Sequence, residues 1–171
     1  MDLKSFIRDI PDFPKTGILF RDISPLLGNP DAFSFAIDGL AKLCHTWQPQ
    51  VVAGIESRGF IFGVALAGSL KLPFVPLRKP GKLPGETLKL AYDLEYGSDA
   101  LEVQRDALTA GQRAIVVDDL IATGGTAKAA GELVRQTGAD LVGYGFAIEL
   151  ADLGGRDRLV DAPVRSLLRY D

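Results

Sequence analysis

Cysteine and histidine are almost missing from this sequence, which has one of each, Cys44 and His45. A single cysteine cannot form an internal disulfide, and it excludes a cysteine-rich zinc site. A lone histidine without a partner motif also argues against the Ser-His-Asp and Cys-His arrangements of nucleophilic catalysis. Sparse cysteine is usual in the reducing cytoplasm, which is where we expect this protein to act.

The sequence also lacks a strong excess of either charge and a long apolar run. Its 19 basic and 22 acidic residues are mixed along 171 positions and leave a net charge of −3. A protein that holds a nucleic-acid backbone needs a concentrated basic face, so nucleic acid is not an expected partner. The apolar stretch from Phe60 to Leu70 is too short to span a bilayer, and no signal-peptide pattern is present. We therefore expect a soluble, intracellular protein without a membrane partner.

What the sequence does contain is the pattern of a single α/β domain. Short, continuous apolar runs are typical of strands buried on both faces, and spacing of three to four residues is typical of helices. The order strand, loop, helix, strand predicts a central parallel sheet flanked by helices. The expected strands are Val51–Ile55, Ala114–Val117 and Leu141–Ile148, and the expected helices are Asp31–Trp47, Phe60–Leu70 and Thr126–Thr137.

Charged residues follow two of these strands. Glu56 begins one charged loop, and Asp118-Asp119 is interpreted as ending the other strand, with a turn from Leu120 to Gly125. Ligands of open parallel sheets bind beyond the carboxyl ends of the strands, so both loops are candidates for a site. Between them, Lys79 to Gly97 holds prolines, glycines and charges, and reads as a long flexible excursion that suits a two-stranded lid.

The strongest motif is VVDDLIATGGT, which ends in a stretch from Ala122 to Thr126 that we call the glycine loop. Its glycines let backbone N–H groups turn around an anion, and the following helix directs its positive end to the same place. Thr123 and Thr126 can add hydroxyl donors. Asp118 and Asp119 suit sugar hydroxyls, so the motif predicts a phosphorylated ribose. The patterns GxxxxGK, GxGxxG after a strand and GxSxG are not found.

This motif resembles the ribose-phosphate signature of the type I phosphoribosyltransferases, in the version carried by members that use adenine. Three further segments are similar to that family in the same order along the chain. They are FPKTGILFRDISPLL, GIESRGFIFG and the pair LRKPGKLPGET and LEYG. The resemblance implies a type I phosphoribosyltransferase fold with a small N-terminal hood, about residues 1–30, and a flexible flap, about residues 78–97.

The resemblance also implies a reaction and its partners. Adenine and 5-phosphoribosyl 1-pyrophosphate would give AMP and pyrophosphate, in purine salvage. Mg²⁺ would be bound mainly through oxygens of the substrate, with no metal site built by the protein alone. The resemblance further implies a homodimer, although no interface can be derived from the spacing.

Site residues follow from the resemblance position by position. Ribose hydroxyls would be bound by Asp118 and Asp119, and the 5′-phosphate by Ala122, Thr123, Gly124, Gly125 and Thr126. Pyrophosphate would be bound by Ser57, Arg58, Lys79, Lys82 and Arg78, the last in a neighbouring subunit. The base would be bound by Phe13, Leu19, Phe20, Arg21 and Leu120. Glu95 and Arg58 would be catalytic, and the loop at Ser57 often holds a non-proline cis peptide in this family.

Several alternatives stay open at this point. Arg58 has a competing interpretation as a surface arginine, Lys79 and Lys82 as solvated charges, and Phe20 and Leu120 as core residues. An enzyme of the same family that acts on another purine fits the residues equally well. The choice of adenine as substrate rests on the N-terminal segment and on the sequence DDLIATGGT. Other classes are a regulator that senses the ribosyl pyrophosphate and a nucleotide-binding module without catalysis.

Overall fold

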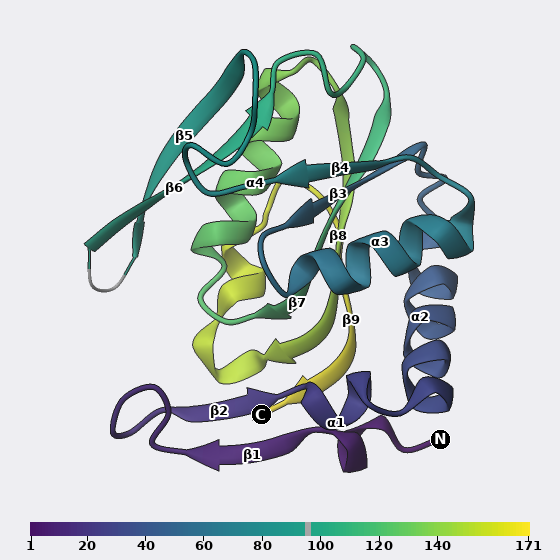
Figure 1. Ribbon diagram of the computed structural model, residues 1–171, viewed down its shortest axis with the longest axis vertical. Coiled ribbons are helices and arrows are strands. Elements are labelled where there is room, and N and C mark those ends of the chain that lie inside the picture. The colour runs from purple at the N-terminus through teal and green to yellow at the C-terminus, as the bar shows by residue number, and fades with distance from the viewer. Residues whose placement is uncertain (95–96) are drawn as a thin grey trace.

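The chain folds around a five-stranded parallel sheet with the strand order β4-β3-β7-β8-β9 (Figure 1). The structure is a computed structural model that describes residues 1–94 and 97–171. The sheet consists of β3 (Val51–Ile55), β4 (Phe74–Leu77), β7 (Arg113–Ile121), β8 (Asp140–Leu150) and β9 (Val164–Tyr170). The helices are α1 (Ser24–Leu27), α2 (Pro30–His45), α3 (Gly59–Leu70) and α4 (Gly125–Gln136), with 3-10 turns η1 (Leu3–Phe6), η2 (Ala151–Leu153) and η3 (Gly155–Arg158). The predicted parallel α/β architecture is confirmed.

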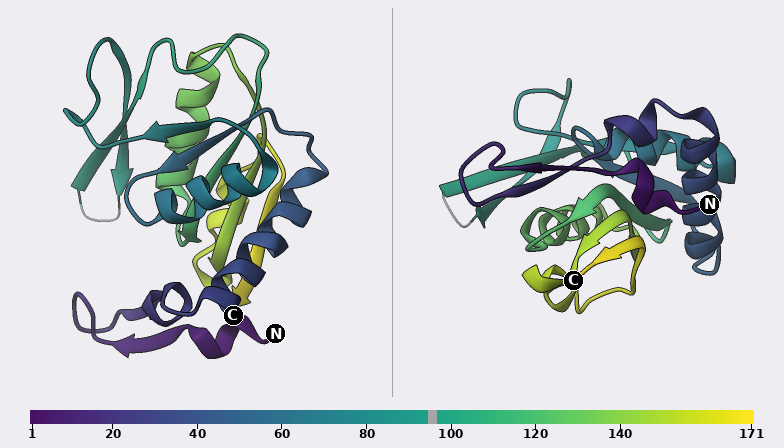
Figure 2. Two further views of the ribbon diagram at one scale, coloured as in Figure 1. Left: turned by 45° about the vertical axis from the view of Figure 1, so that its right-hand side comes forward. Right: turned by 90° about the horizontal axis from the view of Figure 1, so that it is seen from below.

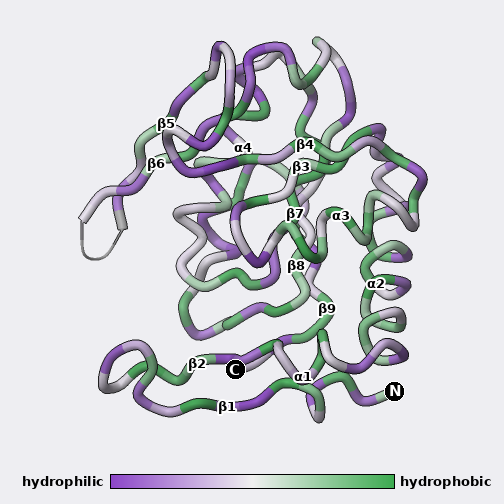
Figure 3. Tube along the Cα trace, viewed as in Figure 1, coloured by the Kyte–Doolittle hydropathy of each residue, from purple (hydrophilic) through white to green (hydrophobic). Residues whose placement is uncertain are grey.

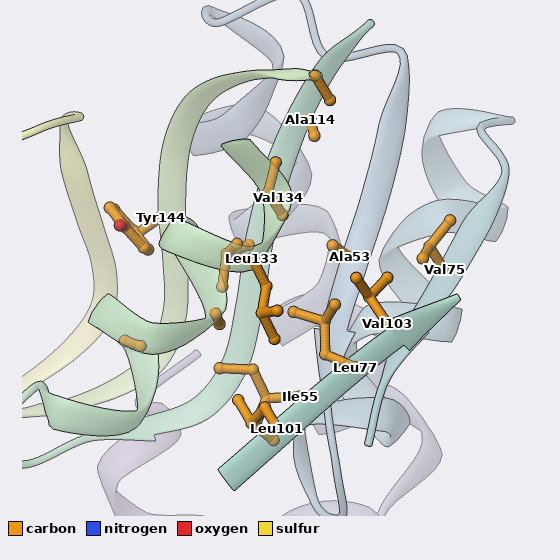
Figure 4. Packing of buried hydrophobic residues seen from close by; sticks show 14 of the residues in the cluster. Ala53, Ile55, Val75, Leu77, Leu101, Val103, Ala114, Leu133, Val134 and Tyr144 are labelled. Atoms are coloured by element: carbon orange, nitrogen blue, oxygen red, sulfur yellow. The ribbon is translucent and has the colours of Figure 1, made fainter. Parts of the chain in front are cut away.

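Two hydrophobic clusters cover the two faces of the sheet. One cluster joins α2 and α3 to one face, and the other joins α4 and the strand β6 to the opposite face. In β3, Val52 belongs to the first cluster and Ala53 to the second, so both faces of this strand are buried. Figure 3 shows the apolar character of the neighbouring central strands β7 and β8, and Figure 4 shows Leu101 and Val103 of β6 near Leu133 of α4.

Helix α2 illustrates how the local sequence sets an element. The Asn29 side chain accepts a hydrogen bond from the backbone N–H of Ala32 at 2.9 Å, and Pro30 occupies the first turn. Both are favoured at a helix start, because the cap satisfies a free N–H and proline has none to lose. The face with helical spacing is buried, and it includes Leu40 and Cys44. The helix begins and ends within two residues of its predicted bounds.

The prediction that Asp118 and Asp119 end their strand was wrong. Strand β7 continues to Ile121, and Asp118 pairs with Phe146 of β8. The neighbouring strand β8 is eleven residues long, so it offers backbone partners well beyond the apolar run. Two acidic residues do not break a strand whose backbone groups have such partners. The turn therefore begins at Ala122, and the two carboxylates are carried by a regular strand.

Two antiparallel hairpins lie outside the sheet. The first joins β1 (Arg8–Pro11) to β2 (Leu19–Asp22), and the second joins β5 (Thr87–Leu94) to β6 (Gly97–Gln104). The views in Figure 2 place the N-terminal hairpin along one end of the molecule, beside the end of β9. There the Arg21 guanidinium lies 4.0 Å from the centre of the Tyr170 ring, and the Lys4 ammonium lies 4.7 Å from it. The excursion after β4 does contain two strands, and its second strand reaches Gln104.

Candidate functional site

The glycine loop forms the junction between β7 and α4. Gly124 precedes the helix with a φ of +80°, a left-handed conformation that glycine adopts without steric cost. No side chain among the described residues caps this helix, so the first N–H groups of α4 are left for another acceptor. A hollow of about 110 Å³ lies over these groups, lined by Asp118, Leu120 and residues 121–127. Backbone donors, the helix dipole and a small hollow together suit a phosphate-sized anion.

Asp118 and Asp119 lie in β7 shortly before this loop, on opposite sides of the strand. Burial raises the pKa of the Asp118 carboxyl well above its ordinary value, and the neighbouring charge of Asp119 raises it further. Burial also raises the pKa of Asp119, against the opposing effect of Arg58. The buried Oδ2 atom of Asp119 receives no hydrogen bond of acceptable geometry from any described residue. A buried carboxylate of this kind is stabilised when a bound ligand donates a hydrogen bond to it.

Arg58 contacts two of the other predicted site residues. It precedes α3, its Nη2 atom lies 2.8 Å from Oδ2 of Asp119, and its guanidinium lies 4.9 Å from the centre of the Phe20 ring. The next residue, Gly59, packs so closely on Asp118 that an added Cβ would lie 2.5 Å from Oδ1. Strands β3 and β7 are adjacent, and this adjacency brings the two loops together. Arg58 therefore lies beside Asp119 and Phe20, and its role in binding stays a prediction.

Glu56 anchors the chain that leaves β4. Its carboxylate accepts hydrogen bonds from Arg78 Nε at 3.2 Å and Nη2 at 3.1 Å, and from the Lys79 backbone N–H at 2.9 Å. The hydrogen bonds from Arg78 hold the pKa of Glu56 below its ordinary value. The peptide bond between Glu56 and Ser57 is cis, and the Ser57 side chain is exposed. Arg78, predicted to serve a neighbouring subunit, is engaged here within its own chain.

Lys79 follows β4 and contacts the second hairpin. Its ammonium pairs with the Asp99 carboxylate, and Tyr92 Oη lies 3.4 Å from its Nζ atom. These contacts hold the pKa of Lys79 above its ordinary value, although its partial burial opposes that direction. Lys82, the other lysine predicted to meet pyrophosphate, is exposed. The sequence offered no signal for Asp99, because its partner is twenty positions away in an irregular segment.

The residues predicted to hold a base lie at the N-terminal hairpin and at β7. The Phe13 and Phe20 rings meet edge to face with their centres 5.0 Å apart. Phe13 and Leu19 are 50% and 46% exposed, which is unusual for large apolar side chains and leaves them available to a flat ligand. Leu120 is half-buried at the end of β7. Arg21 pairs with Asp9, and the predicted residue Glu95 lies outside the described residues.

Alanine at position 124 should destabilise the protein more than alanine at a comparable exposed glycine. A left-handed conformation costs a residue with a Cβ about 1–2 kcal/mol. At Gly124 the Cβ would also lie 2.5 Å from the Gly155 carbonyl oxygen, and such overpacking costs about a further 1–3 kcal/mol. Gly111 has a similar φ of +74° and nothing within 4 Å, so Gly111→Ala is the matched control. Urea denaturation measures both, and equal losses of unfolding free energy would contradict the close backbone contact.

Neither a cluster of metal-binding side chains nor a membrane-spanning helix is found in the described part of the chain. Residues 1–94 and 97–171 contain no group of three or more His, Cys, Asp or Glu side chains placed to hold a metal ion. Within the same residues, none of the helices has the length and apolar character needed to cross a membrane.

Comparisons with known proteins show which proteins this chain is similar to. Residues 27–166 match the family model of the phosphoribosyl transferase domain. The adenine phosphoribosyltransferase of Prochlorococcus marinus (strain MIT 9303) is 60% identical over 171 residues, covering 99% of each chain. The solved adenine phosphoribosyltransferase of Thermoanaerobacter pseudethanolicus ATCC 33223 is 47% identical, with a TM-score of 0.96 over 99% of this chain and 98% of that one. That of Saccharomyces cerevisiae, complexed with an imino-altritol bisphosphate and adenine, is 48% identical, with a TM-score of 0.93 over 98% and 97%.

Proposed function

This chain belongs to the phosphoribosyl transferase family, among its adenine phosphoribosyltransferases, and on that premise we propose that the glycine loop holds the 5′-phosphate of its substrate. The enzyme joins adenine to 5-phosphoribosyl 1-pyrophosphate and releases AMP and pyrophosphate. The main observation behind the proposal is the N-terminus of α4, which no side chain of a described residue caps. This helix follows β7, the strand that carries the two carboxylates. Backbone N–H groups of residues 122–126 would bind the phosphate, with Thr123 and Thr126 adding hydroxyl donors.

The ribose would lie against Asp118 and Asp119. Both carboxylates accept hydrogen bonds when ionised, and the ribose 2′- and 3′-hydroxyls are donors of the right number. The buried Oδ2 of Asp119 is paired in charge with Arg58 but receives no hydrogen bond of acceptable geometry from a described residue. This supports the assignment, because a ligand donor would relieve the cost of its burial. In the free protein the Arg58 guanidinium lies beside Oδ2 of Asp119. We infer that Arg58 leaves Asp119 to meet the pyrophosphate when the substrate binds.

Pyrophosphate would be bound at the carboxyl end of β3. Ser57 and Arg58 follow that strand, and Arg78 and Lys79 are brought beside it by Glu56. Lys82 would join them from the flap, about residues 78–97. Cations at these positions would stabilise the negative charge that grows on the departing group. Arg78 would extend to a neighbouring subunit, in a homodimer.

The base would lie between Phe20 and Leu120. Backbone groups of Leu19 and Arg21 would read its edge, and Phe13 would cover it as part of the hood, about residues 1–30. The aromatic pair of exposed Phe13 and half-buried Phe20 supports this placement, since aromatic rings stack well on a purine. Adenine is therefore proposed to enter beneath the N-terminal hairpin.

Substitution at the anomeric carbon breaks the bond from C1′ to the pyrophosphate oxygen and forms the bond from C1′ to N9 of adenine. The two fixed loops would contribute most by alignment, since aligned groups can recover roughly 7–11 kcal/mol of a barrier. Glu95 would take or orient the N9 proton, a smaller contribution. Closure of the flap would keep water from the electrophilic ribose.

Mg²⁺ fits this site as a cation carried in by the substrate. The unsatisfied Oδ2 of Asp119 and the raised pKa of Asp118 mark the carboxylates that suit a hard cation shared with ligand oxygens. When bound, the metal would neutralise charge on the pyrophosphate. We place the enzyme in the cytoplasm, without a nucleic-acid or membrane partner, as its sparse cysteine and balanced charge suggest.

One assay tests the activity and its base preference. The enzyme is incubated with 5-phosphoribosyl 1-pyrophosphate, Mg²⁺ and an equal mixture of adenine, hypoxanthine and xanthine, and the nucleotides are separated. AMP is the expected main product, together with an equal amount of pyrophosphate. Ligand binding without pyrophosphate release would favour a sensor, and a different nucleotide would favour a sister enzyme. AMP soaked into crystals should lie on the glycine loop.

A further inference from the structure

A buried ionic network lies behind the glycine loop, at the end of β8. The Glu149 side chain is only 4% exposed, and Arg156 contacts both of its oxygens. Arg156 Nε donates to Glu149 Oε1 at 2.8 Å, while its Nη2 and the Ser166 hydroxyl both donate to Oε2. Arg156 Nη1 also donates to the Val164 carbonyl at 2.7 Å. These bonds join the end of β8, the turn η3 and strand β9 at one point.

The residue before Arg156 touches the glycine loop directly. A Cβ on Gly155 would lie 2.2 Å from the Ala122 carbonyl oxygen and 2.9 Å from the Gly124 nitrogen. Two backbones are therefore in close contact without an intervening side chain. The pairing of Ile121 with Glu149 brings the same two segments together from the strand side. The segment of residues 151–158, which we call the brace, packs directly against the backbone of the loop, and it does not contribute to the lining of the hollow.

We propose that Arg156, held by Glu149 and Ser166, is a positioning residue that presses the brace against the glycine loop and so sets the affinity for the 5′-phosphate. This inference rests on the proposed role of the glycine loop. Arg156 itself does not line the hollow, and its side chain donates hydrogen bonds to Glu149, Val164 and Ser166. Its planar guanidinium satisfies Glu149, Ser166 and the Val164 carbonyl at once, which a lysine ammonium cannot do in one geometry.

The physical reason is that backbone donors bind an anion well only when they are fixed in advance. A small displacement of a binding group can cost a large factor, and residues that support a site have effects of roughly tenfold or more. Without Arg156, the buried Glu149 charge would lose its main partner, and the brace would relax away from Gly124. Phosphate affinity should then fall, while the base site on the N-terminal hairpin should be unaffected.

Arg156→Ala is tested by titration calorimetry with ribose 5-phosphate and, separately, with adenine. We expect the dissociation constant for ribose 5-phosphate to rise roughly tenfold and that for adenine to stay within about twofold. Arg156→Lys should give an intermediate rise for ribose 5-phosphate. Thermal unfolding of each variant separates loss of affinity from loss of fold, and Ser166→Ala replaces Arg156→Ala if the latter does not fold.

Arg135→Ala is the matched control. Arg135 also pairs with a carboxylate, that of Asp161 just beyond the brace, and its side chain is 37% exposed against 40% for Arg156. It should leave ribose 5-phosphate affinity within about twofold. Equal effects of both alanine variants, or none from Arg156→Ala, would overturn the positioning role. Failure of the unaltered enzyme to bind ribose 5-phosphate would instead overturn the proposed function of the loop.

Discussion

Replacement of Glu95 by leucine is expected to lower the turnover number roughly a hundred- to ten-thousandfold, the range of general acid–base catalysis. The proposed role of Glu95 is to take or orient the proton on N9 of adenine as the bond to C1′ forms. Strand β5 precedes Glu95 in the sequence, and its Asp93 carbonyl oxygen lies 3.5 Å from the position of an added Cβ on Gly125. The hairpin therefore reaches the first residue of α4, beside the proposed phosphate site.

The measurement is the turnover number at saturating adenine and ribosyl pyrophosphate, together with the dissociation constant of the ribosyl pyrophosphate. Only the turnover number should change, since Glu95 is not proposed to bind the phosphates. Glu86→Leu makes the same chemical change on the same excursion, at a side chain that is 87% exposed, and it should leave turnover unchanged. A normally folded Glu95→Leu enzyme with full turnover would remove Glu95 from the mechanism.

Replacement of Asp118 and Asp119 together by asparagine should weaken binding of the ribosyl pyrophosphate by a hundredfold or more. A hydrogen bond to a charged group contributes about 1.5–3 kcal/mol, and a difference of 1.4 kcal/mol is a factor of ten. Two such acceptors are lost in this variant. Calorimetric titration measures the change, and Asp140→Asn, at an exposed position on the amino end of β8, is the control. An unchanged affinity would reject the ribose assignment.

The single variant Asp118→Asn should at the same time make the free protein more stable at neutral pH. Because burial raises the pKa of Asp118 in the folded state above 3.8, its ionisation opposes folding. This penalty develops as the pH rises from 3.8 to the raised pKa, and it then stays constant. The melting temperature of Asp118→Asn should therefore exceed that of the original protein at pH 7 and approach it near pH 4. A constant difference across this range would contradict the raised pKa.

The sheet was predictable because its strands are buried on both faces. Val51–Ile55 was predicted at its observed bounds. A continuous apolar run is typical of a strand buried on both faces, so the prediction did not depend on deciding which residues face the core. The carboxyl ends of β3 and β7 were expected to carry the site, and parallel pairing makes them neighbours. The end of β7 was misplaced at Asp118, because an acidic pair looks like a strand end when the partner strand is unknown.

Contacts between distant segments could not be predicted from spacing. Nothing near Glu56 in the sequence indicates that it holds Arg78, and nothing near Arg58 indicates that it pairs with Asp119. The brace was missed as well, although Gly154-Gly155 after the last expected helix and strand was a weak signal. A glycine indicates a close approach, but only the fold identifies the backbone that approaches.

The contact between Arg21 and Tyr170 has a consequence for the order in which the molecule can be completed on the ribosome. The N-terminal hairpin is made before β9, yet the guanidinium of its Arg21 packs on a ring carried by β9, the last described strand to be made. Until β9 is made, Arg21 lacks this contact, and two-stranded hairpins are at best marginally stable alone. The native position of the hairpin, where adenine is proposed to bind, therefore depends in part on a strand made much later.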